Sequence, residues 1–589
     1  MISFAKKLTT LLLLSTSLAA SPVDSSQALR PKDGEQFLKN LGEDAQLFIG
    51  NDEKRQWWVD SRFGVFMHWN PSSIEGTSIS WGRGGLRPHH SSKENKKGVP
   101  AERYDNLYKE FNPVKFDADA WIKMVKDSGA KYFVFTSKHH DGFCMFDTKH
   151  TEYNIMNTPF KRDICKELAL ACEKYDIKLF FYYSQPDWNH PDYKKKDLKD
   201  YNKFLHKQIG ELLEYPSLAG IWWDGLGKHI NTWNGVDLVK MIKKRRPDIL
   251  MNPRFAPRKW RFGDYDTPEQ EIGGFQNDRP WETCLTMGQK WSHVHNTNQV
   301  LPFEVCMRSL IRCAGGDGNL LLNVGPTPEG TIRQVEQDNY RNMGKWLKQY
   351  GESIYGTRGG PYKPAHWGTA TRTKEAIYLH VLQQWPNGVL ELTDPGVKID
   401  SAQALTGGDV RFEQTNGRLK IFMDAKDHNT INTIIKLTTT SNPLEANIIA
   451  PTQLSQSLSR HSASKITAST NQEGAGALIK SGKEFVSGAH HRKAWSGKGF
   501  DKKPSLEIDF GSAKTFSKVL IEERMAWTDM CRGFHLEYLD SKGQWKEIAT
   551  GKYLGYFTLQ HEPITAQKVR IRFINHERST SILSFDIFE

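Results

Sequence analysis

The run Leu179-Phe180-Phe181-Tyr182-Tyr183-Ser184 is short, almost wholly apolar and rich in aromatic residues. Such a run is typical of a strand that is buried on both faces of a parallel sheet. An amphipathic stretch with helical spacing, Arg162 to Tyr175, precedes it, and another, Leu198 to Leu213, follows it. A buried strand between two helices predicts a repeating β/α unit.

The same alternation extends over residues 35–358. The other strand-like runs are Phe63–Trp69, Tyr132–Ser137, Gly220–Asp224, Ile249–Asn252 and Asn319–Val324, and the other helical stretches include Ala118–Ser128 and Gly235–Arg246. Repeated β/α units of this kind predict a TIM-like (β/α) barrel as the catalytic domain. A doubly wound sheet is the second interpretation, but no glycine-rich dinucleotide loop follows the first strand.

Beyond residue 358 the pattern changes to alternating strands separated by Pro, Asn and Gly turns, which predicts a β-sandwich over residues 359–450. Residues 451–464 are rich in Ser and Gln and are expected to form a linker. Strand patterns return in residues 465–589 and predict a second all-β module.

The N-terminus has the features of an export signal. Lys6 and Lys7 precede an apolar stretch around Leu11 to Leu14, and small residues follow at Ala19 and Ala20. Residues 1–20 are therefore expected to be a signal peptide of a secreted or periplasmic protein. The apolar stretch is too short to cross a bilayer, so no membrane partner is expected.

The chain is basic, with 80 Lys and Arg against 68 Asp and Glu, a formal net charge of +12. No zinc-finger, RNA-binding or basic-helix pattern accompanies this charge, so nucleic acid is not expected as a partner. Two interpretations stay open: a solvated basic surface, or a surface for an acidic partner such as a sulfated glycan.

The seven cysteines are an odd number without metal-binding spacing, and most are expected to be buried thiols. A disulfide between Cys306 and Cys313 is left open, because export permits disulfides without requiring them.

Polar and aromatic residues follow several of the predicted strands, where a TIM barrel places its active site. Singly, each aromatic residue also fits ordinary core packing. Together, imidazoles, aromatic faces and a carboxylate on one rim are suited to bind a neutral sugar. The residues are His68, His139, His140, Tyr182, Trp222 and Asp224.

Cleavage of a glycoside requires two carboxyl groups at the anomeric carbon. Asp224 ends an apolar strand and is the candidate nucleophile, although an Asp that caps a turn is the alternative for these residues alone. Glu269, in a loop that Gly263 and Pro268 delimit, is the candidate acid/base, with Glu282 as the alternative.

A metal site is disfavoured. His139 and His140 are adjacent, so on a strand they point to opposite faces, and at most one easily joins His68. No HxH or HExxH spacing is present, and we expect neither a metal nor an organic cofactor.

At these residues the sequence resembles glycoside hydrolase family 29, the retaining α-L-fucosidases. The motifs that carry the resemblance lie in order along residues 40–360. They are Arg62–Trp69, Ser137–Phe143 through Lys149, Lys161–Asp163, Tyr182–Ser184, Trp222–Gly225, Trp281–Cys284, Gly318–Pro326 and Gly351–Gly356.

The resemblance implies a TIM barrel followed by a β-sandwich, with Asp224 as nucleophile and Glu269 at the acid/base position. It also implies that Arg254 lies near the nucleophile. The sugar contacts that it implies are His68, Trp81, His139, His140, Tyr182 and Trp222. Ser80 stands where many members have a Glu before the Trp, so one polar contact to the substrate is expected to be absent.

Residues 465–589 resemble the discoidin, or coagulation factor 5/8 type C, β-sandwich. The likeness rests on Lys465–Ser469, Lys493–Trp495, Ser505–Gly511, Val569–Phe573 and Ser584–Phe588. It implies a carbohydrate-binding module, and a purely structural lid is the alternative.

The expected function is that of an exported retaining exo-α-L-fucosidase, which releases L-fucose from a fucosylated glycan or fucan, with sulfation of the substrate left open. Two alternatives are kept. One is a related exo-glycosidase for a fucose-like sugar (an α-L-galactosidase), which has only one added hydroxyl to accept. The other is a non-catalytic, lectin-like fucose binder.

Overall fold

The structure is a computed structural model of the chain. It describes residues 30–589 except 90, 226–229, 273, 296–299, 366, 383–387, 451–456, 461–463, 473–474, 476–477, 479–494, 497–502, 524–530, 532, 552–553, 555 and 575–580. The predicted signal peptide, residues 1–20, lies outside the described residues.

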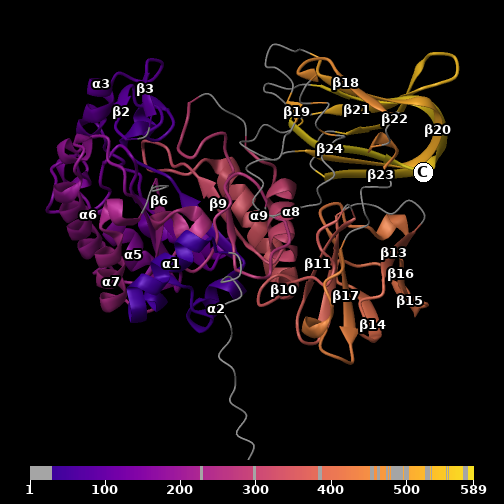
Figure 1. Cartoon of the computed structure of the whole chain (residues 1–589), viewed down its shortest axis with the longest axis horizontal. Coiled ribbons are helices and arrows are strands. Elements are labelled where there is room, and N and C mark those ends of the chain that lie inside the picture. The colour runs from indigo at the N-terminus through magenta and orange to yellow at the C-terminus, as the bar shows by residue number, and fades with distance from the viewer. Residues whose placement is uncertain are drawn as a thin grey trace, which may run out of the picture.

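A curled sheet of seven parallel strands forms the first half of the chain, in the order β7-β6-β5-β4-β1-β9-β8 (Figure 1). The strands are β1 (Phe63–Met67), β4 (Tyr132–Lys138), β5 (Lys178–Ser184), β6 (Leu218–Asp224), β7 (Leu250–Met251), β8 (Glu282–Thr286) and β9 (Asn319–Val324). Nearly all of their residues are buried on both faces, as the apolar runs predict. The predicted TIM-like fold is confirmed.

The segment Gly263–Gln270 fills the gap between the edge strands β7 and β8. The Asp264 amide donates to Met251 O on β7 at 2.8 Å. On the other side, the Glu282 amide donates to Asp266 O at 2.9 Å, and the Gln270 amide donates to Cys284 O at 2.9 Å. The segment therefore occupies the place of an eighth strand, and the sequence alone had predicted only a loop there.

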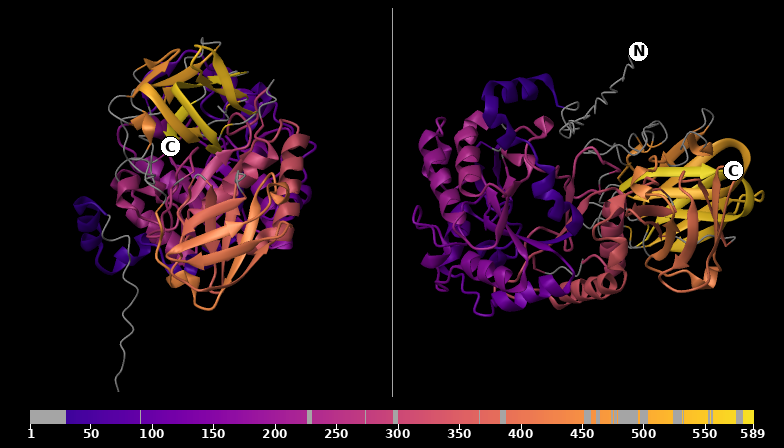
Figure 2. Two further views of the ribbon diagram at one scale, coloured as in Figure 1. Left: turned by 90° about the vertical axis from the view of Figure 1, so that its right-hand side faces the viewer. Right: turned by 90° about the horizontal axis from the view of Figure 1, so that it is seen from below.

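Helices surround this sheet, as Figure 2 shows in the view from below. They are α1 (Lys32–Leu41), α2 (Asp52–Ser61), α3 (Ala101–Asn106), α4 (Ala118–Asp127), α5 (Ile164–Tyr175), α6 (Lys199–Leu212), α7 (Gly235–Arg245), α8 (Phe303–Gly315) and α9 (Gln334–Tyr350). Asp117 and Asp163 cap α4 and α5, because each carboxylate accepts an amide N–H of the first helical turn. A small antiparallel hairpin, β2 (Gly85–Arg87) and β3 (Ser91–Asn95), precedes α3.

Two antiparallel sheets follow the barrel. One has the order β10-β11-β12-β17-β14 and the other β13-β16-β15. The strands are β10 (Arg358–Gly359), β11 (Gly368–Arg372), β12 (Ala376–Val381), β13 (Val389–Thr393), β14 (Ile399–Ala404), β15 (Arg411–Thr415), β16 (Arg418–Phe422) and β17 (Thr433–Thr439). Residues of both β12 and β17, including Tyr378 and Ile434, belong to the same buried core as the barrel. The five-stranded sheet is therefore docked against the barrel, and a separate core lies between the two sheets.

The C-terminal module has its own core. Its described strands join into one curled sheet, because β20 and β23 are long enough to bend at shifts in their pairing. They are β18 (Lys465–Ala468), β19 (Trp495–Ser496), β20 (Ser505–Glu523), β21 (Phe534–Leu539), β22 (Trp545–Gly551), β23 (Tyr556–Phe573) and β24 (Ser581–Phe588).

Part of the expected linker belongs to this module. The short helix η14 (Leu458–Arg460) packs on β24, where the Arg460 guanidinium pairs with Asp586 at 2.6 Å. The Ile587 amide donates to Ser459 Oγ at 3.1 Å. Residues 457–460 are thus ordered by contacts with the last strand, which Ser-rich composition does not reveal.

All seven cysteines are buried thiols outside any disulfide, as most were expected to be. The disulfide between Cys306 and Cys313, which the sequence left open, is ruled out. Both residues lie on α8, seven positions apart, so about 10 Å of helix separates them. A disulfide requires Cα atoms within about 7 Å.

Within the described part of the chain, no helix combines the length and apolar character needed to cross a bilayer.

Candidate active site

A pocket of about 290 Å³ opens where the carboxyl ends of the parallel strands meet. Thirteen residues line it, and they include every predicted sugar contact, the predicted nucleophile and the first-choice acid/base. They are Phe66, His68, Trp81, His139, His140, Tyr182, Trp222, Asp224, Gly225, Arg254, Arg258, Glu269 and Trp291. The polar and aromatic residues that the sequence places after the strands therefore line a single site.

Asp224 lies at the end of β6 with its side chain 21% exposed. Its Oδ2 accepts the Tyr182 hydroxyl at 2.9 Å, and its Oδ1 accepts Arg254 Nη1 at 2.8 Å. Burial alone would raise the pKa of this carboxyl, but the charges of Arg254 and His140 outweigh burial and lower the pKa well below its ordinary value. Asp224 is thus an ionised carboxylate held rigidly at the pocket.

Arg254 connects the two candidate carboxylates. It lies in the short helix η8 (Pro253–Phe255), which follows β7. Its Nη1 donates to Asp224 and its Nη2 donates to Glu269 Oε2 at 3.0 Å, while Nε donates to Thr267 Oγ1 at 3.0 Å. One guanidinium therefore fixes both carboxylates as neighbours across the pocket.

Glu269 and Glu282 occupy very different surroundings. Glu269 projects from the segment between β7 and β8 and is 27% exposed in the pocket. Glu282 is 1% exposed beneath the pocket, where it accepts the Tyr132 hydroxyl at 2.6 Å and Trp222 Nε1 at 2.9 Å. Burial raises the pKa of Glu282 to about 7. Only Glu269 is placed where it can reach a bound substrate.

His68 is fixed in one tautomer. Asn323 donates its Nδ2 to Trp291 O at 2.6 Å, so its Oδ1 faces His68 Nδ1 at 2.7 Å as an acceptor. Burial lowers the pKa of His68 to about 3, which keeps the ring neutral. The proton therefore sits on Nδ1, and Nε2 is left as an acceptor.

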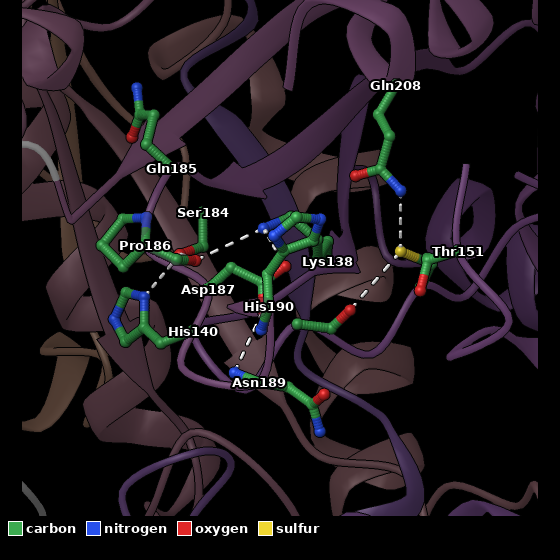
Figure 3. Close-up of polar contacts among 12 residues, drawn as sticks. Lys138, His140, Thr151, Ser184, Gln185, Pro186, Asp187, Asn189, His190 and Gln208 are labelled. Atoms are coloured by element: carbon green, nitrogen blue, oxygen red, sulfur yellow. Dashed lines mark hydrogen bonds and ion pairs between the residues drawn. The ribbon is translucent and has the colours of Figure 1, made fainter. Parts of the chain in front are cut away.

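The position of a proton on the His140 ring is deduced from its neighbours in the same way. Ser184, the last residue of β5, donates its hydroxyl to Pro186 O at 2.8 Å and lies 2.6 Å from His140 Nδ1 (Figure 3). Because the single hydroxyl proton is committed to Pro186, His140 Nδ1 must be the donor. Nε2 of His140 lies 3.7 Å from Asp224 Oδ2 and faces this carboxylate, whose pKa the charge of the ring lowers.

Ser80 fixes His139 in the same way. Its Oγ donates to Asp141 Oδ2 at 2.9 Å and lies 2.6 Å from His139 Nδ1. Burial lowers the pKa of His139 well below its ordinary value. Ser80 itself is buried and does not line the pocket. Ser80, which departs from the family pattern, therefore positions His139 and does not contact the pocket itself.

The expectation that adjacent histidines point to opposite faces is wrong. The strand β4 ends at Lys138, so His139 and His140 lie where the chain turns, and both side chains line the pocket. The ring of His139 is 5.7 Å from that of His68 and stacks at 5.2 Å on Tyr182.

A buried ion pair supports the turn that carries Ser184 and Trp188. Lys138 is fully buried, and its Nζ lies 3.3 Å from Pro186 O and 3.5 Å from Asp187 Oδ2 (Figure 3). Asp187 Oδ1 accepts the His190 amide at 2.9 Å. Lys138, the last residue of β4 before the two histidines, therefore anchors the neighbouring loop.

Sequence reasoning missed four lining residues: Phe66, Gly225, Arg258 and Trp291. Phe66 had a usable signal, because it lies two positions before His68 on the same face of β1. Arg258 begins the short helix η9 (Arg258–Trp260) and Trp291 lies in an irregular connection, and nothing in their local sequence indicates that they face the pocket.

Comparisons with known proteins agree with this geometry. A family model described as alpha-L-fucosidase matches residues 47–352, and a model of the F5/8 type C domain matches residues 465–585. The plasma alpha-L-fucosidase of Rattus norvegicus is 29% identical over 370 residues, which cover 58% of this chain and 80% of that protein.

Solved structures give the same assignment. Alpha-L-fucosidase isoenzyme 1 from Paenibacillus thiaminolyticus is 30% identical with a TM-score of 0.60, covering 66% of this chain and 99% of that one. A GH29 alpha-L-fucosidase from Bacteroides thetaiotaomicron, solved as a trapped covalent intermediate with 2-fluoro-fucosyl fluoride, is 27% identical with a TM-score of 0.59, covering 67% and 98%. The predicted resemblance is confirmed: this chain belongs to the α-L-fucosidase family of glycoside hydrolases, GH29.

Proposed function

We propose that this hydrolase is an exported, retaining exo-α-L-fucosidase in which Asp224 is the nucleophile and Glu269 the acid/base. The observation that carries this proposal is the pair of carboxylates held by Arg254 at one small pocket. The pocket has room for a single terminal sugar, because its volume is about 290 Å³.

In the proposed reaction, Asp224 Oδ2 or Oδ1 attacks the anomeric carbon and forms a fucosyl-enzyme ester. Glu269 gives its proton to the departing glycosidic oxygen, and then, as a carboxylate, takes a proton from the water that releases fucose. The lowered pKa of Asp224 keeps it ionised for attack. The trapped covalent intermediate of the Bacteroides relative supports retention.

The substrate is proposed to be a fucosylated glycan or fucan. The neutral rings of His68 and His139 present acceptor nitrogens, which suit a sugar with several hydroxyl donors, while Phe66, Trp222 and Trp291 offer apolar faces. An α-L-galactoside differs by one hydroxyl on the methyl group and remains the second candidate substrate.

Hydrolysis of an aryl α-L-fucoside against the matching α-L-galactoside tests the activity. We expect kcat/KM to favour the fucoside, with the α-anomer of fucose appearing first by NMR. Equal rates, or first appearance of the β-anomer, would contradict the proposal.

The dependence of the rate on the leaving group tests which residue is the acid/base. Glu269→Ala should reduce hydrolysis of substrates with poor leaving groups far more than that of a dinitrophenyl fucoside, because only the former need protonation. Glu282→Ala is the comparison, and leaving-group dependence confined to Glu282→Ala would move the role to that residue.

The C-terminal module is proposed to bind carbohydrate and to keep the barrel near its substrate. Its match to the F5/8 type C model supports a recognition module, and its separate core supports independence from the barrel. Export is proposed from the basic and apolar pattern of residues 1–20, together with the plasma location in the name of the rat relative.

A further inference from the structure

A second hollow, with a volume of about 490 Å³, lies outside the pocket described above. Its walls come from two segments: one leads into α6 and includes the first two turns of that helix, and the other is the short helix η7 (Ile230–Trp233) with Asn234 after it. Both segments follow carboxyl ends of barrel strands, the first after β5 and the second after β6. The hollow therefore opens on the same face of the barrel as the active site.

The walls of this hollow are polar and basic. Lys196, Lys199 and Lys203 contribute to them, and residues 192–203 carry five lysines against three aspartates. Lys203 pairs with Asp200 at 3.0 Å. Among the described residues, none forms an ion pair with Lys196 or Lys199, so two exposed ammonium groups face solvent at this rim.

A buried acceptor in the wall also lacks a partner. Asn202 is only 9% exposed and donates its Nδ2 to Thr232 O at 3.1 Å. No described group donates to its Oδ1. A buried acceptor without a donor costs free energy, and a shift of the Asn202 side chain that opens Oδ1 to the hollow would let a hydroxyl of a bound molecule satisfy it.

A series of contacts connects this hollow with the active-site pocket. The Arg87 guanidinium lies over Trp81, which lines the pocket, with 5.2 Å to the ring centre, and over Trp188 with 5.5 Å. Two residues further on, His89 packs on Tyr193 at 5.1 Å and contacts Lys195 O at 3.0 Å. Lys196 of the hollow follows directly. The aromatic rings of Trp188 and Tyr193 in this series are buried, and Arg87, His89 and Lys196 are its cationic or polar members that reach solvent.

We propose that this hollow is a second saccharide-binding site, which takes an anionic sugar unit of the chain whose terminal fucose enters the pocket. The ammonium groups of Lys196 and Lys199 bind the anionic substituent, a sulfate ester or a carboxylate, and the wall amides bind hydroxyls. The part of this proposal that concerns fucose rests on the proposed function; the binding of the anionic unit does not.

Calorimetric titration of the full chain with a sulfated fucan octasaccharide tests the site. The chain carries Asp224→Asn so that the probe is not consumed. The test variant is Lys196→Gln with Lys199→Gln. The matched control is Lys126→Gln with Lys244→Gln, two exposed lysines in the last turns of α4 and α7, on the opposite side of the barrel. Both pairs remove the same net charge.

We expect the test variant to bind the sulfated probe about tenfold more weakly than the parent, and the control to change binding less than twofold. The desulfated octasaccharide should not distinguish the three proteins. An oligouronate of equal length identifies the anion: if it shows the larger loss, the site takes carboxylates rather than sulfate esters.

Equal loss in both variants would overturn the proposal, because net charge alone would then account for binding. Failure of the sulfated and the uronate probes to distinguish the variants would overturn it as well. Hydrolysis of a neutral aryl fucoside by the unmodified enzyme tests the proposed function separately, so the two failures are distinguishable.

Discussion

At the scale of single residues, the hydrogen bonds behind the pocket decide what the pocket can bind. Asn323, Ser80 and Ser184 each fix the Nδ1 proton of one histidine. In the neutral rings of His68 and His139 this leaves Nε2 as an acceptor, whereas Nε2 of His140 faces Asp224. The sequence indicated the histidines, because they follow apolar strands. It could not indicate the three partners, which come from other strands and loops.

Ser184→Ala should weaken recognition of one substrate hydroxyl. Without Ser184 Oγ, His140 loses the acceptor that holds its Nδ1 proton, and the orientation of its ring in the pocket is no longer fixed. We expect kcat/KM for an aryl fucoside to fall about tenfold. The loss should disappear for one member of a 2-, 3- and 4-deoxyfucoside series and be rescued by Ser184→Thr. A uniform loss across the series would indicate a merely structural role.

Glu282 gives a pH dependence of stability rather than of catalysis. Burial raises its pKa from the ordinary 4.5 to about 7 in the folded state. The folded protein therefore keeps a proton that the unfolded chain releases, so this contribution is complete below pH 4.5 and is lost as the pH rises towards 7.

Urea unfolding of Glu282→Gln measures that contribution. The amide can accept from Trp222 and donate to Tyr132, and it does not ionise. We expect the free energy of unfolding of the parent to fall by about 2–3 kcal/mol between pH 4.5 and 8 relative to that of the variant. Glu53→Gln, at an exposed position of α2, is the control. Parallel pH curves for parent and Glu282→Gln would show that the carboxyl is ionised in the folded state.

At the scale of elements, local patterns predicted the strands that are buried on both faces. The runs around β1, β4, β5, β6 and β9 are apolar, and each became a strand of the barrel. The strand β8 was missed, because Glu282-Thr283-Cys284-Leu285-Thr286 is largely polar although it is buried. The placement of Glu269 was also beyond local reasoning, since it depends on closure of the sheet between β7 and β8.

Lys138→Met should disrupt the loop beyond β5. The variant leaves the buried Asp187 without its cation, which costs about 3–5 kcal/mol in comparable cases. We expect a lower free energy of unfolding and a lower kcat/KM, because the same loop carries Pro186, which holds Ser184, and Trp188. Lys126→Met, at an exposed position, should change stability by less than about 0.5 kcal/mol. Similar free energies of unfolding for Lys138→Met and Lys126→Met would contradict the stabilising role of the Lys138–Asp187 ion pair.

At the scale of the whole molecule, the two β regions differ in how they attach. Tyr378 and Lys436 of the five-stranded middle sheet both contact Glu352 beside the barrel. Residues of this sheet share the barrel core, in addition to the core that the two middle sheets form themselves. The C-terminal module has a core of its own. In sequence, both regions showed the same alternation of strands and turns, which does not reveal whether a core is shared.

A chain that ends at residue 455 should therefore fold and keep hydrolysing a small aryl fucoside, with kcat/KM within about twofold of the full chain. Its action on a fucose-containing polymer should fall, because the module raises the local concentration of substrate. Equal retention of both activities would assign the module a structural role. Loss of both would show that the barrel depends on the module.

The central claim, that Asp224 is the nucleophile, is tested most directly by labelling the full chain with 2-deoxy-2-fluoro-α-L-fucosyl fluoride. The fluorine slows release of the covalent ester, so the sugar should remain attached during proteolysis and mass spectrometry. The account predicts one fluorofucosyl group per chain, on the peptide that contains Asp224, and no label in Asp224→Ala. A label on any other residue, or undiminished hydrolysis of aryl fucosides by Asp224→Ala, would contradict it.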